Sequence, residues 1–101
     1  MLEDKHQPWR KVFLLHIINP DEYPIYEQHV HRAFKYLENN RIEEISKSNN
    51  EKYNVYFNEY LQFFNEFRRK ANKFSVKEID EALWTFGKYI KEYPNFCGVQ
   101  T

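Results

Sequence analysis

The sequence predicts an all-α fold, built as a compact array of about four helices. Its 101 residues include only two glycines and four prolines, so there are few points at which a helix must break. The alternation of apolar and polar residues that marks strands is almost absent, and apolar residues instead recur at intervals of three and four. A chain of this length builds one core. We therefore expect a single domain over 1–101, either whole or the C-terminal portion of a longer protein.

The first two helices are expected at 9–18 and 24–38. The stretch PWRKVFLLHII opens with a proline, which suits a first helical turn, and is apolar nearly all round between Val12 and Ile18. This pattern predicts a short buried helix. The sequence NPDEYP then breaks it, because its last proline disfavours helical geometry at the preceding residue.

A polar connection over 38–50 separates these helices from two longer ones. The capping-box sequence SNNE opens a helix expected at 49–72, and a second box, SVKE, opens one at 76–92, which ends at Tyr93 before a proline. The longer helix carries a single stripe of residues spaced three and four apart, all aromatic except the last. Its members are Tyr53, Phe57, Tyr60, Phe64, Phe67 and Ala71.

Aromatic residues make up 19% of the chain and must supply much of the core. The predicted core consists of Phe13, Leu15, Val30, Phe34, Phe57, Leu61, Phe64, Ile79, Leu83 and Phe86. Several tyrosines exceed what one small core can hold, and we expect them on a surface for a partner or a second copy of the chain. These are Tyr23, Tyr26, Tyr36, Tyr56 and Tyr89.

The charges balance, with fifteen basic and fifteen acidic residues, so no global positive field draws the chain to DNA. DNA binding would need a local patch. The one dense basic stretch, FRRKANK, offers Arg68, Arg69, Lys70 and Lys73 as candidates for phosphate contact. The same cations suit a solvated helix end, where the helix dipole favours them.

We predict no metal site and no cofactor. His29 and His31 are two positions apart and would point about 200° away from each other on a helix, and His6 and His16 lack ligands at a suitable spacing. The two glycines stand apart, so no nucleotide-binding loop is present. The single cysteine, Cys97, indicates a reducing, cytoplasmic setting. No apolar run approaches the ~20 residues of a membrane span, and we expect no membrane contact.

The stretch PIYEQHVHRAF, residues 24–34, carries a carboxylate, Glu27, followed by His29 and Arg32 within apolar surroundings. It resembles the helix-hairpin-helix DNA glycosylases, the superfamily of endonuclease III and the 8-oxoguanine glycosylases. Their pattern there is Asp, one residue, His, an apolar residue, one residue and often Arg. The resemblance implies that Glu27 is the catalytic carboxylate, with Lys11 and His29 beside it and Arg32 at the DNA.

The resemblance covers residues 8–37 and, loosely, the last helix, which is the rear part of such an enzyme. The hairpin glycines that approach the DNA backbone are missing, because KHQPW stands in their place. The carboxylate is Glu instead of Asp, and the cysteines of the iron-sulfur members are absent. The helical subdomain across the base pocket has no counterpart.

Two functions follow. The first is a noncatalytic helical domain, resembling a glycosylase fragment, that acts by association as a homo-oligomer or with a missing N-terminal subdomain. The alternative is a DNA base-excision module with Glu27 as its catalytic carboxylate. If Glu27 is structural, it should cap its own helix, and Arg32 should pair with an acid elsewhere.

Overall fold

The computed structural model describes residues 7–93, with side chains from residue 10 onward, and this part of the chain is helical without any strand. The all-α prediction is confirmed. The elements are α1 (Gln7–Ile18), α2 (Gln28–Asn39), α3 (Asn49–Val55), the π-helical segment η1 (Tyr56–Tyr60), α4 (Leu61–Lys70) and α5 (Val76–Glu92). Because α3, η1 and α4 follow one another without a break, they form one long helix, here called the rod.

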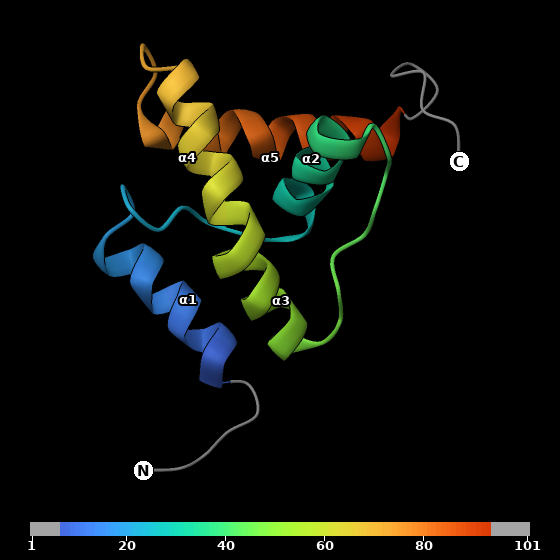
Figure 1. The fold of residues 1–101 in the computed structure, drawn as a ribbon. Helices are drawn as coiled ribbons and strands as arrows, with labels where there is room; N and C mark the ends of the chain where they lie inside the picture. The colour runs from blue at the N-terminus through green and yellow to red at the C-terminus, as the bar shows by residue number, and fades with distance from the viewer. Residues whose placement is uncertain (1–6, 94–101) are drawn as a thin grey trace.

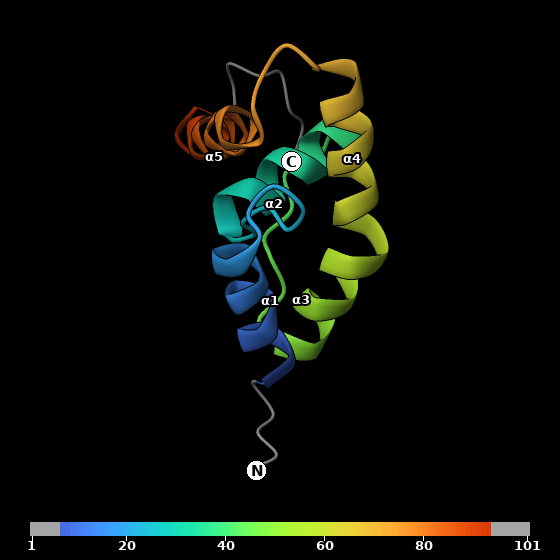
Figure 2. The same cartoon turned by 90° about the vertical axis from the view of Figure 1, so that its left-hand side faces the viewer.

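The rod crosses the molecule, and the other helices lie along one side of it (Figures 1 and 2). Helix α1 packs against α3 at one end, and α2 packs against α5 at the other end. The segment between α2 and α3 runs along the outside of the molecule (Figure 1). The core therefore lies between the rod and a layer made by α1, α2 and α5.

Side-chain caps fix where three of the helices begin. Ser48 and Ser75 accept bonds from backbone amides at the starts of α3 and α5, as the two capping boxes predict. The predicted start of α2 at Pro24 is wrong, because the extended residue Glu27 caps the helix and Gln28 is its first residue. Helix α4 ends at Lys70, just short of the expected boundary.

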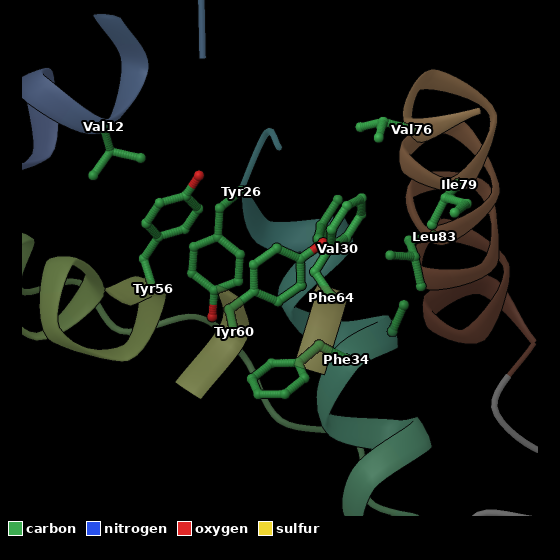
Figure 3. Close-up of a cluster of buried hydrophobic side chains, with 11 residues drawn as sticks. Val12, Tyr26, Val30, Phe34, Tyr56, Tyr60, Phe64, Val76, Ile79 and Leu83 are labelled. Atoms are coloured by element: carbon green, nitrogen blue, oxygen red, sulfur yellow. The ribbon is translucent and has the colours of Figure 1, made fainter. Parts of the chain in front are cut away.

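The centre of the core is a group of tyrosines (Figure 3). The ring of Tyr26 lies 5.7 Å from that of Tyr56 and 4.7 Å from that of Tyr60, and Phe34 meets Tyr60 edge-on at 5.4 Å. The wider turn of η1 turns both Tyr56 and Tyr60 inward, since both are fully buried. The surface predicted for Tyr26 and Tyr56 is therefore wrong.

The other residues predicted for the core are buried to different degrees. The buried members of the predicted core are Val30, Phe34, Phe64, Ile79 and Leu83, and the half-buried ones are Leu15, Phe57, Leu61 and Phe86. Of the remaining surplus tyrosines, Tyr23 and Tyr36 are half-buried and Tyr89 is exposed. Three residues considered in the sequence, His6, Cys97 and Gly98, lie outside the described residues.

Helix α1 is not the buried helix that its sequence predicts. Its inner face meets the rod through Val12, which is buried. The opposite side carries four apolar side chains that remain in water, which we call the outer face of α1. Phe13 is 55% exposed, Leu14 51%, Ile17 59% and Ile18 77%. The prediction fails because α1 lies at the edge of the molecule, where only one side of a helix can be covered (Figure 2).

Helices α2 and α5 cross at very short range. A Cβ placed on Gly87 would lie 1.7 Å from the carbonyl oxygen of His29, so no side chain fits at this position. The Gly87 carbonyl in turn accepts a bond from Arg32 Nη1 at 3.0 Å. Gly87 therefore fixes how closely the two helices approach.

Candidate functional site

Glu27 caps α2. Its backbone is extended, and its Oε1 accepts a bond of 2.7 Å from the amide of Val30. Within the described part of the chain, neither Lys11 nor His29 hydrogen-bonds this carboxylate, and Lys11 is exposed on α1. The geometry is that of a structural N-cap, which satisfies a free amide at a helix start.

His29 supports a buried arginine. Its Nδ1 accepts a bond of 2.9 Å from Arg32 Nη1, which leaves a proton for the other ring nitrogen when the imidazole is neutral. The ring also meets Trp84 of α5 edge-on, at 5.0 Å between centroids. His29 thus belongs to the contact between α2 and α5.

Arg32 has no exposed surface, so the expectation that it lies at the DNA is not met. Its Nε and Nη2 donate to the two carboxylate oxygens of Glu44, at 3.2 and 2.8 Å. This bond holds the pKa of the Glu44 carboxyl below its usual range, although burial opposes the shift. Arg32 therefore joins α2, the connection after it and α5, as the pairing alternative anticipated.

The basic stretch lies at the end of α4 and in the turn that follows. Arg68 Nη1 donates to the carbonyl of Asp21 at 2.8 Å, and Arg69 pairs with Glu66. Lys70 and Lys73 are exposed. Two of the four proposed phosphate ligands are therefore engaged within the chain.

A cavity of about 420 Å³ lies between α2, the connection after it and the first part of the rod. Its floor holds a chain of bonds in which the Tyr26 hydroxyl contacts His31 Nδ1 and His31 Nε2 contacts Glu43 Oε2 at 3.1 Å. Burial lowers the pKa of His31, although the bond to Glu43 opposes the shift. A neutral imidazole protonated on Nε2 fits both contacts.

This chain of bonds resembles a nucleophile, base and orienting acid in its order. Both nitrogens of His31 are nevertheless occupied, and burial, reinforced by nearby carboxylates, raises the pKa of Tyr26 far above its usual value. The His31 imidazole therefore has no free nitrogen to accept a substrate proton. The contact instead ties Glu43 to α2, and the sequence could not show it because Glu43 lies twelve residues from its partner.

Asp80 is a buried carboxylate on α5, only 8% exposed, and its Oδ1 has no hydrogen-bond partner in the described part of the chain. The hydroxyl of Tyr60 is likewise buried without one. Burial raises the pKa of Asp80 to about 6, against a smaller opposing effect of the Ile25 amide and of His16. The sequence pattern does not reveal that Asp80 is buried, because the apolar residues of α5 recur regularly around it.

Comparisons of the chain with protein-family models, with curated proteins and with solved structures give no match. Among residues 7–93, no three His, Cys, Asp or Glu side chains are grouped to hold a metal ion. In the same part of the chain, no helix is both long and apolar enough to cross a membrane. The described feature most typical of a binding surface is the outer face of α1, with its four exposed apolar side chains.

Proposed function

We propose that this chain is a noncatalytic helical domain that acts by association, and that a second copy of the chain covers the outer face of α1. The observation that carries the proposal is the set of four apolar side chains on that face, each more than half exposed. The proposal takes from the glycosylase resemblance only a common ancestry and no activity.

The outer face has the physical character of a docking surface. Apolar side chains that remain in water gain free energy when another apolar surface covers them. Single exposed apolar residues are ordinary, but a continuous row on one helix marks an interaction site. Because Val12 holds the inner side of α1 against the rod, the row is presented on a supported helix.

A second copy is the occupant that the charge and shape of this face favour. The chain has no net charge at pH 7, so two copies meet without overall repulsion. A straight apolar row on one helix is also complementary to itself, which is the requirement for a two-fold interface. The excision alternative lacks comparable support, because Glu27 is bonded as a cap and Arg32 is buried.

Sedimentation velocity over a range of concentrations up to ~100 μM tests the proposal, since specific interfaces of ordinary size bind more tightly than that. We expect a concentration-dependent dimer. Leu14→Glu should abolish it by placing a charge in the apolar row. Leu37→Glu is the matched control, because Leu37 is 46% exposed but lies on α2.

A purely monomeric natural chain throughout this range would overturn the proposal. Equal loss of dimer in both variants would also overturn it, because the interface would then not centre on α1. Circular dichroism of each variant establishes that the helices are retained.

A further inference from the structure

Charged residues mark the two ends of the outer face differently. Arg10 and Lys11 are exposed in the first turns of α1, before the apolar row begins. Asp21 and Glu22 are exposed just after the helix ends. Within residues 10–22, whose side chains the structure describes, the row therefore lies between a basic end and an acidic end.

The acidic end is held in place. The backbone amide of Glu22 donates to the carbonyl of Asn19 at 3.2 Å, and the ring of His16 bonds to the carbonyl of Tyr23 at 2.9 Å. Arg68 of α4 donates to the backbone carbonyl of Asp21. The backbone of this turn thus stands at a defined position relative to α1, and none of these bonds uses the side chain of Asp21 or Glu22, so substituting those side chains leaves the bonds intact.

Helical geometry decides which residues line the row. At about 100° per residue, Arg10, Leu14 and Ile17 fall close to one line along the helix, with Phe13 and Ile18 on its flanks. Val12 falls on the opposite side, in agreement with its burial against the rod. When two such helices are set antiparallel about a point between residues 15 and 16, each outer-face residue meets an apolar counterpart. Leu14 then faces Ile17, and Phe13 faces Ile18.

We infer that two copies pair their α1 helices antiparallel about a two-fold axis, so that Arg10 and Lys11 of each copy face Asp21 and Glu22 of the other. This inference rests on the proposed function and specifies its geometry. A parallel pairing would set basic end against basic end and acidic against acidic. It would also align the two helix dipoles unfavourably, whereas the antiparallel pairing opposes them.

Charge reversal tests the orientation. The basic-end variant carries Arg10→Glu and Lys11→Glu, and the acidic-end variant carries Asp21→Lys and Glu22→Lys. Each should weaken the dimer about tenfold or more, because attraction turns into repulsion at two symmetric places. The variant with all four substitutions restores opposite charges across the antiparallel interface and should dimerise like the natural chain.

Salt provides an independent readout. Added salt should weaken the dimer of the natural chain and of the fourfold variant, since it screens attraction. It should strengthen each two-residue variant, where it screens repulsion. The pair Lys73→Glu and Lys77→Glu, at two exposed lysines away from α1, controls for the change in net charge of the basic-end variant.

The outcomes separate this inference from the proposed function. If Leu14→Glu abolishes the dimer but charge reversal leaves it unchanged, the α1 interface stands and the antiparallel orientation is wrong. If the fourfold variant stays as weak as the two-residue variants, the orientation is again wrong. Binding of a strictly monomeric chain to vesicles of anionic lipid would overturn both, and would assign the outer face to a membrane surface.

Discussion

Asp80 is a carboxylate that burial makes costly to ionise, and its pKa near 6 gives this cost a measurable pH dependence. In the unfolded chain the carboxyl loses its proton at lower pH than in the folded protein. Stability is therefore highest at low pH with respect to this group, falls as pH rises from about 4 to about 6, and stays level above. A buried ionised group without a full set of partners is the physical reason.

We expect Asp80→Asn to stabilise the protein at pH 7.5 by about 3 kcal/mol, because the shift amounts to about two pKa units at 1.36 kcal/mol each. At pH 4.5 the two chains should differ much less. Urea unfolding at both pH values measures this, with the exposed neighbour Glu81→Gln as control. The lowered pKa of His31 makes stability rise with pH, but this effect is the same in both chains and does not change the difference between them. A stabilisation independent of pH would contradict the assignment.

Glu27 separates the structural interpretation from the enzymatic one. As an N-cap that bonds the Val30 amide, it should contribute about 1 kcal/mol to stability, and Glu27→Ala should lose that amount. Neither the natural chain nor Glu27→Gln should release damaged bases from duplex DNA, and the natural chain should show no salt-dependent binding. Base release by the natural chain that Glu27→Gln lacks would instead establish the excision function.

At the scale of the helices, the contact of α2 with α5 depends on Gly87, which has no side chain. We expect Gly87→Ala to cost about 3 kcal/mol or more, because its Cβ would overlap the His29 carbonyl and the helices must separate. Thermal unfolding measures the loss. Thr85→Ala, at an exposed position of the same helix, should change stability little. Equal stability of the Gly87 variant and the natural chain would mean that the helices are not in this contact.

Most of the information on the number of helices, and on where α3 and α5 begin, is present in the sequence. The caps Ser48 and Ser75 are local signals that depend on three residues each, and the structure bears them out. The sequence predicts that α2 begins at Pro24, whereas Glu27 caps it and Gln28 is its first residue. Local sequence does not separate these two starts, because tertiary context decides between Pro24 and the capping carboxylate. Helix periodicity could not reveal η1, where a wider turn brings Tyr56 inward in place of Phe57.

Burial of tyrosines and exposure of α1 could not be inferred from composition. Buried tyrosines usually need a partner for the hydroxyl. Those of Tyr26 and Tyr56 reach His31 and the Pro24 carbonyl, which the sequence does not place, whereas that of Tyr60 is buried without a partner among the described residues. An all-round apolar helix such as α1 is as compatible with a second copy as with a core. The resemblance around Glu27 identified a distinctive segment, but its polar side chains hold the fold together.

At the scale of the whole molecule, association and stability are linked. If folded copies pair through α1 and unfolded chains do not, the melting temperature should rise with protein concentration. We expect this rise for the natural chain and for Leu37→Glu, and none for Leu14→Glu. Differential scanning calorimetry at several concentrations measures it. A melting temperature of the natural chain that is independent of concentration would contradict a stable dimer.

The bond between Arg32 and Gly87 joins residues 55 positions apart, and this separation bears on how the chain folds in time. The rod is held by local contacts and can form early, whereas docking of α5 on α2 must first close a long loop. We therefore expect this docking to limit the folding rate. Because the entropy of closure grows only with the logarithm of loop length, residues inserted at the exposed Lys47, beyond the bonds made by Glu43 and Glu44, would slow folding only slightly.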